Sequence, residues 1–495
     1  MRLNQAYNHI GSKRLQIIAF YVFALSFILL NAWLVVEKKT MLGFLIPALI
    51  GILIIAALSY DKLIWLSIIL TPLSVPLQEL YYGLPFDMAI PTEPIMFGIL
   101  ILFSISWARG ARLDSKLILH PVAIVIYFYL GWMAVTSFTS TMPVVSFKYL
   151  VVHIWYVVIF FFIMAFLFVK HSRIFNFIWA YAIPVVPVIF YTIARHIANG
   201  MHNDNAAHWV MKPFYNDHTS YGAVLSMFIP FLLSFVFAKW ISKKKRFWIG
   251  ILLSVFVLAE VLSYSRAAWL SLIAALGVWG IMKLKIKFKT LAITFSILVL
   301  TIFAFQDQIL MKLEQNSTDS SANLTEHISS ITNISTDASN VERINRWQCA
   351  IEMFKEKPVF GWGPGTYAMN YAPYQLTRQR TIISTNTGDG GNAHSEYLGP
   401  LSEQGVLGMF SFILIVIVVL YTGIKAYTRA DDKRIKTLLL ASVAALVTYY
   451  THGVLNNFLD TDKAAVPFWG ITAIIVALDL YTKKQKNTLP ENTTA

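Results

Sequence analysis

Long apolar stretches recur along almost the whole chain, separated by shorter polar segments. Because a helix needs roughly 17–25 mostly apolar residues to cross the hydrocarbon core of a membrane, each stretch predicts a transmembrane helix. The predicted spans are 16–36, 41–59, 92–108, 118–138, 147–169, 174–195, 221–239, 247–264, 267–283, 288–305, 405–427, 435–453 and 464–482. A weaker stretch, 62–78, contains Pro72 and Pro76 and predicts a broken or re-entrant segment. The pattern predicts an all-α polytopic membrane protein with about 12–14 transmembrane helices.

Composition and charge agree with a membrane protein and argue against a nucleic-acid-binding one. The chain is 57% hydrophobic and 13% charged, unlike soluble domains. Its net charge of +14 is spread over alternate loops, which the positive-inside rule assigns to the cytoplasm together with both termini. Lys38 and Lys39 are the exception to this alternation. No basic stripe with interleaved aromatic residues predicts nucleic-acid binding. The first span follows basic residues as a signal peptide would, but its length predicts that it is retained.

The same orientation predicts that polar segments 79–91, 139–146, 196–220, 307–404 and 454–463 face outward. The chain is thus expected to divide into N-terminal spans (1–306), one long outward loop (307–404), C-terminal spans (405–482) and a cytoplasmic tail (483–495). Within the long loop, 315–340 is rich in Ser, Thr and Asn and predicts a flexible stretch. From residue 341 an amphipathic helix is expected, with Ile344, Trp347, Ile351 and Phe354 on its apolar face.

Three motifs surround the long loop. In the first motif, His394 and Ser395 are adjacent, Gly405 follows after nine intervening residues, and Gly408 follows after two more. This motif lies where the loop meets a predicted span. The segment Arg266-Ala-Ala-Trp-Leu270 stands at the end of another span. Arg343 and Arg346 precede the turn sequence GWGPGTY. Together these motifs, over roughly 221–427, resemble bacterial O-antigen ligases, in a superfamily that also contains O-antigen polymerases and protein oligosaccharide transferases.

The resemblance implies a reaction at the outer face of the bacterial inner membrane. Ligases of this family transfer a glycan from undecaprenyl pyrophosphate to a sugar hydroxyl of lipid A–core, in the periplasm. Arg266, with Arg343 or Arg346, would bind the pyrophosphate, because a guanidinium forms paired hydrogen bonds to phosphate oxygens. His394 would be the general base. Inversion is expected at the anomeric carbon, and neither metal nor cofactor is expected, because pyrophosphate is already a good leaving group and no paired carboxylates stand beside the site.

Further polar residues are candidates for substrate binding, each with a structural alternative. Glu260 lies inside a predicted span, where it either has a function or pairs with a neighbouring helix. Asp217 and His218 either contact substrate or form a helix cap. Glu396, like Glu403, would orient the imidazole or act as the base, and Tyr397, like Tyr371 and Tyr374, would stack on sugars. Arg266 could simply anchor its helix at the interface, and His394 could decorate a helix start capped by Asn392.

Three other functions remain open from the sequence. A polymerase would use the same donor with a second lipid-linked glycan as acceptor, and a protein-directed transferase would use a protein hydroxyl. A transporter of the lipid-linked sugar would predict internal repeats and polar residues near mid-membrane, and no repeat is visible. Membrane lipids are the expected surroundings and a monomer is the default. Cys349 is the only cysteine, so no intramolecular disulfide can form.

Overall fold

The computed structural model describes residues 21–22, 25–31, 33, 60–80, 87–201, 204–284, 338–375 and 391–488. The chain forms two compact units, Met1–Ile64 and Trp65–Ala495. In the first unit the described residues between 21 and 33 are helical, and Asn31 Nδ2 donates a hydrogen bond of 2.8 Å to the Phe27 carbonyl. The predicted spans 41–59 and 288–305, most of 16–36 and nearly all of the predicted flexible stretch 315–340 lie outside the described residues.

The second unit is built of long apolar helices, and every candidate site residue lies in it. These helices are α5 (Thr92–Ala108), α7 (Pro121–Phe138), α8 (Pro143–Tyr156), α10 (Ser172–Ala198), α12 (His218–Val236), α13 (Lys243–Leu262), α14 (Arg266–Leu284), α20 (Leu398–Arg429), α21 (Lys433–Leu455) and α22 (Asp462–Thr488). A π-helical stretch, η3 (Val157–Ile163), continues α8 into α9 (Met164–Leu167) as one span.

Within the described residues, eight helices are long and apolar enough to cross a membrane. The protein is therefore an all-α multi-pass membrane protein, and this prediction is confirmed. The total of 12–14 spans stays a prediction, because several of those spans lie outside the described residues.

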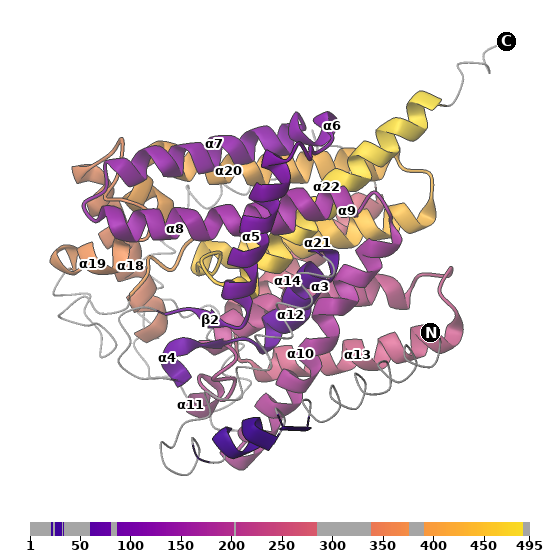
Figure 1. The fold of residues 1–495 in the computed structure, drawn as a ribbon, viewed down its shortest axis with the longest axis horizontal. Coiled ribbons are helices and arrows are strands. Elements are labelled where there is room, and N and C mark those ends of the chain that lie inside the picture. The colour runs from indigo at the N-terminus through magenta and orange to yellow at the C-terminus, as the bar shows by residue number, and fades with distance from the viewer. Residues whose placement is uncertain are drawn as a thin grey trace, which may run out of the picture. The chain divides into compact units, whose positions relative to one another are not determined.

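Helix α21 is the centre of the bundle. It packs against α12, α14, α20 and α22, and α7 runs along the outer side of α20 (Figure 1). The most deeply buried spans are α12, α21 and α22. Where they meet α10, the rings of Tyr181 and Phe228 stack with centroids 4.8 Å apart. Because lipid tails are as apolar as these helices, close packing of this kind holds the spans together more than the hydrophobic effect does.

Short elements fill one end of the bundle. Helix α3 (Tyr60–Leu70) is followed by η2 (Thr71–Leu73), so the predicted break in 62–78 is confirmed and lies next to Pro72. The strands β1 (Val75–Pro76) and β2 (Ala89–Ile90) then form a small antiparallel ribbon that hydropathy did not predict. Helices α4 (Leu77–Leu80) and α11 (Asp204–Ala207) are also short, whereas α6 (Ser115–Ile118) directly precedes α7, at the end of the bundle away from the ribbon (Figure 1).

The described part of the long loop lies at the end of the bundle where α7 ends and α8 begins (Figure 1). It contains α18 (Ala338–Glu356), α19 (Tyr367–Asn370) and η4 (Ala372–Tyr374). The helix expected from residue 341 is confirmed. The face that packs against the protein is not its apolar face: Ile344 is 37% exposed, whereas Asn345, Arg346 and Cys349 are buried. The helix thus presents polar residues of the site to the rest of the protein.

Helix α20 contains a kink at Gly405, whose backbone angles are φ 70° and ψ −168°. Side chains are almost never found in this region, so the position requires glycine. A Cβ atom there would also lie 2.1 Å from the Val359 carbonyl oxygen. The kink lets the N–H of Val406 donate to the Pro358 carbonyl at 3.0 Å. Gly405, predicted as the start of a span, is thus the point where the long loop is fixed to α20.

We expect Gly405→Ala to destabilise the protein by at least about 1–3 kcal/mol, because it adds both backbone strain and a collision with the Val359 carbonyl. Thermal unfolding in detergent, followed by intrinsic fluorescence, measures the loss. Gly131→Ala in α7 is the matched control, since a Cβ there meets nothing within 4 Å. Equal melting temperatures for the two variants would contradict the role of the kink.

Candidate active site

His394 lies in a tight turn before α20. Its φ angle is 48°, a left-handed conformation that is uncommon for residues other than glycine. Its N–H donates to Asn392 Oδ1 at 3.1 Å, and its carbonyl accepts a hydrogen bond from Trp347 Nε1 at 3.3 Å. Asn392 therefore holds the turn and does not cap α20; the N–H groups of Tyr397 and Leu398 donate to Ser395 Oγ instead. The His394 backbone is fixed from both sides, and its side chain is half-buried.

Glu396 anchors the same turn to α21 and to the loop after it. Its Oε1 atom accepts hydrogen bonds from the Tyr449 hydroxyl at 2.5 Å and from the N–H groups of Phe458 and Leu459 at 2.8 and 3.0 Å. Its own N–H donates to the Gly453 carbonyl at 2.8 Å. Burial raises the pKa of Glu396 to about 7, although these hydrogen bonds favour the ionised form. Because protein groups occupy this oxygen, we interpret Glu396 as a positioning residue.

Arg346 projects from α18 and is buried. Its Nε donates to Glu342 Oε1 at 2.6 Å, and its guanidinium carbon lies 4.0 Å from the ring centre of Tyr371. A Cβ atom on Gly391 would lie 1.3 Å from Arg346 Nη1, so a side chain there would displace the guanidinium. Among the described residues Nη1 has no hydrogen-bond partner. A buried, unpaired guanidinium nitrogen is costly, and an anionic ligand would satisfy it.

Arg343 and Arg266 add two further positive charges. Arg343 lies one helical turn before Arg346, and its Nε donates to the Leu455 carbonyl at 3.3 Å. Burial and the charge of Arg266 lower the pKa of Arg343 to about 10, so it stays protonated at neutral pH. Arg266 is the first residue of α14. The like charges of Arg266 and Arg343 disfavour each other, the charge of Asp217 partly offsets that of Arg343, and the arrangement suits a further anion.

These arginines also act on His394. Burial and the positive charges of Arg343 and Arg346 lower the pKa of His394 to about 4, against the opposing effect of Asp217. The imidazole is consequently neutral at neutral pH and can accept a proton. The structure thus brings His394, Arg343 and Arg346 together, with Arg266 beside Arg343.

Asp217 is the N-cap of α12. Its Oδ1 accepts hydrogen bonds from the Ser220 N–H at 2.7 Å and from the Thr219 hydroxyl at 2.8 Å. Burial alone would raise the pKa of Asp217, but these hydrogen bonds and the neighbouring His218 lower it overall. The ring of His218 lies against that of His208, with centroids 4.2 Å apart. Asp217 is therefore a cap, as the structural alternative predicted, yet it also lies within electrostatic reach of Arg343 and His394.

Three other candidates, Glu260, Tyr397 and Glu403, have protein partners. Glu260 on α13 is buried and accepts a hydrogen bond from Ser226 Oγ at 3.0 Å, with no ion pair among the described residues. Tyr397 donates its hydroxyl to the Tyr450 carbonyl at 3.0 Å. Glu403 Oε1 accepts the Tyr367 N–H at 2.9 Å.

Tyr371 is fully buried beneath Arg346 and is not available to a sugar, so its predicted stacking role is wrong. Tyr374, which was predicted to stack in the same way, donates its hydroxyl to Glu356.

Two residues that sequence reasoning missed complete the surroundings. His452 is buried on α21 within reach of Arg343 and Asp217, and neither ring nitrogen has a hydrogen-bond partner among the described residues. An ionisable residue inside the predicted span 435–453 was a signal that could have identified it. Glu342 orients Arg346 from one helical turn earlier, and the spacing of the two residues on α18 was visible in the sequence.

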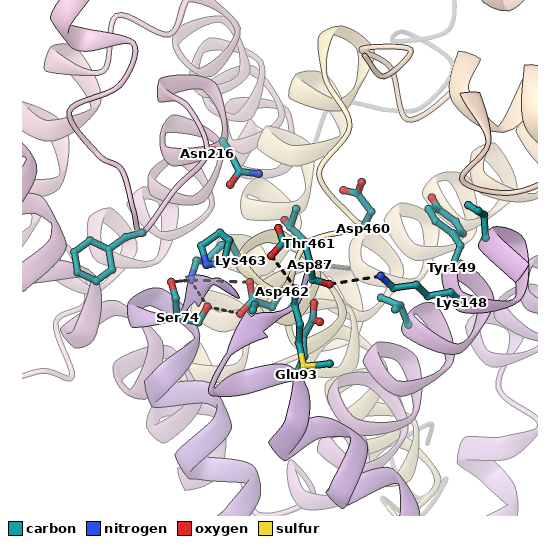
Figure 2. A pocket seen from close by; sticks show the side chains of 17 residues that line it. Ser74, Asp87, Glu93, Lys148, Tyr149, Asn216, Asp460, Thr461, Asp462 and Lys463 are labelled. Atoms are coloured by element: carbon teal, nitrogen blue, oxygen red, sulfur yellow. Dashed lines mark hydrogen bonds and ion pairs between the residues drawn. The ribbon is translucent and has the colours of Figure 1, made fainter. Parts of the chain in front are cut away.

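Two cavities adjoin this region. One, of about 130 Å³, is lined by the turn residues Asn392, Ala393 and Ser395 and by Glu396 and Glu403. The other, of about 320 Å³, lies between the β1–β2 ribbon, α8 and the loop before α22 (Figure 2). Tyr149 and Asp460 line both. Across the described residues, His, Cys, Asp and Glu form no group of three placed to hold a metal ion.

Comparison with known proteins gives one result that bears on these residues. No curated protein matches the chain significantly. Residues 255–413, about a third of the chain, match the family model described as O-Antigen ligase. The matched segment runs from α13 into α20 and contains Glu260, Arg266, Arg343, Arg346 and His394, but not Asp217 or His218. The protein is a multi-pass membrane protein that carries a domain of the O-antigen ligase family.

Proposed function

We propose that the protein is an O-antigen ligase that transfers a glycan from undecaprenyl pyrophosphate to a sugar hydroxyl of lipid A–core. The observation that carries the proposal is that Arg343 and Arg346 lie close enough to His394 to disfavour its charged form, with Arg266 beside Arg343. In this proposal that end, with loop 307–404, faces the periplasm of a bacterial inner membrane and both termini are cytoplasmic. The two lipid-linked substrates enter from the bilayer, and the protein works as a monomer.

The arginines hold the donor. The pyrophosphate oxygens bond Nη1 of Arg346, which has no hydrogen-bond partner among the described residues, and lie beside Arg343 and Arg266, whose charges repel each other. As the glycosidic bond breaks, negative charge develops on the leaving oxygen, and the guanidinium groups stabilise it. The reaction needs no nucleotide or metal in this scheme, because the energy is stored in the sugar–pyrophosphate bond.

His394 activates the acceptor. It takes the proton of the attacking hydroxyl while that oxygen bonds to the anomeric carbon, in one displacement that inverts the configuration. Burial and the positive charges of Arg343 and Arg346 hold the pKa of His394 at about 4. A bound dianion offsets those charges and raises the pKa of His394, so the donor makes the histidine a better base.

Other transferases and a transporter remain alternatives. A polymerase or a protein-directed transferase would use the same donor site with another acceptor. Glu260, Asp217, His218, Glu396 and Tyr397 are proposed as supporting residues around the substrates. A transporter is disfavoured because the charged groups collect at one end of the bundle rather than at its middle.

The first prediction concerns the reaction. Purified protein, given undecaprenyl-pyrophosphate glycan and lipid A–core, should form core-linked glycan, and His394→Ala should lose at least about a hundredfold in rate. His171→Ala, at the start of α10, is the control and should retain activity. Lengthening of the donor without attachment to core would mean a polymerase. If no product forms although the donor binds, a protein acceptor or transport becomes the better hypothesis.

The second prediction concerns pH. The acid limb of kcat/KM, which reports the free protein, should lie near pH 4. The acid limb of kcat, which reports the substrate complex, should lie roughly one to two pH units higher, because the bound dianion stabilises the imidazolium. Stopped assays between pH 3.5 and 8, with circular dichroism to confirm folding, give both limbs. A kcat limb at or below that of kcat/KM would exclude His394 as the base.

The third prediction concerns the guanidinium of Arg346. Arg346→Lys keeps the charge but removes the planar group that bonds Glu342 and presents Nη1. A drop in kcat/KM for the donor of roughly tenfold to a hundredfold is expected, since a hydrogen bond to a charged group contributes about 1.5–3 kcal/mol. Arg112→Lys, an exposed arginine after α5, is the control. Unchanged donor kinetics in Arg346→Lys would remove Arg346 from the donor site.

A further inference from the structure

The larger cavity lies outside every motif that the sequence singled out. It is enclosed by the β1–β2 ribbon, the start of α5, the middle of α8, the segment before α12 and the loop before α22 (Figure 2). Its volume of about 320 Å³ is at the lower end of the range for small-molecule sites and leaves room for roughly one or two sugar rings. None of Arg266, Arg343, Arg346 or His394 lines it.

The floor of the cavity is a buried ion pair that is already satisfied. Asp462 Oδ2 accepts hydrogen bonds from the hydroxyls of Ser74 and Thr92, both at 2.6 Å. Lys463 Nζ donates to the carbonyls of Thr71 and Ser74 at 2.5 and 2.7 Å. These bonds fix the ribbon to the start of α22, so the cavity has a rigid base.

The rim offers groups of a different kind. Asp460, Asn216 and Lys148 are exposed residues that line the cavity, and Figure 2 shows their side chains among those that surround it. Lys148 Nζ lies 3.5 Å from the Asp87 carbonyl oxygen, which is the upper limit of distance for a hydrogen bond. Tyr149 and Phe214 add aromatic surface. Carboxylate, amide and ammonium groups beside aromatic rings can bond hydroxyl groups and cover the apolar face of a sugar.

The charge of the lining argues against a phosphate ligand. Four carboxylates border the cavity, those of Asp87, Glu93, Asp460 and Asp462, against the two ammonium groups of Lys148 and Lys463. An anion would be repelled here, whereas the arginine cluster attracts one. A neutral ligand with many hydroxyl groups suits this lining.

The larger cavity adjoins the turn that carries His394. Tyr149 and Asp460 line both cavities, and the smaller one is also lined by Asn392, Ala393 and Ser395 of that turn, although His394 lines neither. In the proposed reaction, a glycan whose reacting end lies at His394 places its next sugars past this turn, toward the larger cavity.

We propose that the cavity between β1–β2, α8 and the loop before α22 is a saccharide subsite that holds sugar rings remote from the reacting one. This proposal rests on the proposed glycan transfer. The rings belong either to the donor glycan or to the core acceptor, which share the same hydroxyl chemistry. Asp460 and Asn216 hydrogen-bond their hydroxyl groups and Tyr149 packs on a ring face.

Binding of free oligosaccharides tests the subsite independently of catalysis. The probes are lipid-free O-antigen repeat units and lipid-free core oligosaccharide, titrated calorimetrically into detergent-solubilised protein. His394→Ala should bind one of the two as wild type does, and that probe identifies the source of the rings. Asp460→Ala/Asn216→Ala should weaken its binding about tenfold or more, as expected for the loss of two hydrogen bonds. Asp431→Asn, an exposed carboxylate after α20, is the control.

Kinetics supply the second readout, with Asp460→Asn as the conservative variant. The double variant should raise KM for one substrate about tenfold with kcat nearly unchanged, and a substrate shortened to a single sugar should show no such difference. Transfer with wild-type KM values and oligosaccharide affinities in the double variant would overturn the subsite while leaving the proposed function intact.

Oligosaccharide binding that depends on Asp460 and Asn216, in a protein that transfers no glycan, would support the subsite and refute the transferase. Stabilisation of wild type by Ca²⁺ or Mg²⁺ alone, lost in Asp460→Ala and without oligosaccharide binding, would overturn the subsite in favour of a cation site.

Discussion

One carboxylate oxygen connects the parts of the site. Glu396 Oε1 accepts the Tyr449 hydroxyl and two consecutive N–H groups of the loop between α21 and α22, while the Glu396 N–H bonds back to the Gly453 carbonyl. A buried acceptor with three donors is expensive to disrupt, because each donor would lose its partner without reaching water. The bond network fixes the turn of His394, two residues earlier, and also the loop that carries Asp460. Both cavities therefore depend on the same anchor.

Hydropathy predicted the eight spans that the described residues contain, because membrane insertion depends on length and apolar content, which are local properties of sequence. Hydropathy did not predict the features that depend on contacts between residues distant in the sequence. The helix of the loop was predicted, but its buried face turned out to carry Asn345 and Arg346 in place of the apolar Ile344. The kink at Gly405 is a similar case: the glycine was visible, but the Val359 carbonyl that requires it is brought there only by folding. The two-residue strands of the ribbon are too short to leave a periodic signal.

The site could be predicted to the extent that its residues belong to short motifs. His394, Arg266, Arg343 and Arg346 were identifiable because each belongs to a motif whose spacing can be read in the sequence. In the structure, Arg266 lowers the pKa of Arg343, and Arg343 and Arg346 lower the pKa of His394. The roles of Glu396 and Tyr371 were not identifiable. A carboxylate beside a histidine resembles an orienting group, and only the positions of Tyr449, Phe458 and Leu459 show that it binds the protein instead. Tyr371 was predicted to stack on a sugar, but the guanidinium of Arg346 lies against its ring.

The distribution of charge suggests how the protein orients an amphiphilic substrate with an anionic centre. Arginines concentrate on α18 and at the start of α14, where Nη1 of Arg346 has no partner within the described part of the chain, while carboxylates concentrate around the cavity beyond Tyr149. A pyrophosphate placed in that cavity would meet the wrong sign of charge, and a neutral sugar placed among the arginines would leave their charges uncompensated. Each region thus rejects the other's ligand, so charge alone would orient a lipid-linked glycan with its phosphates near His394 and its sugars directed away. Orientation by charge in this way requires no large movement of the protein. This agrees with the turn of His394 and the base of the larger cavity, both of which are held by buried hydrogen bonds.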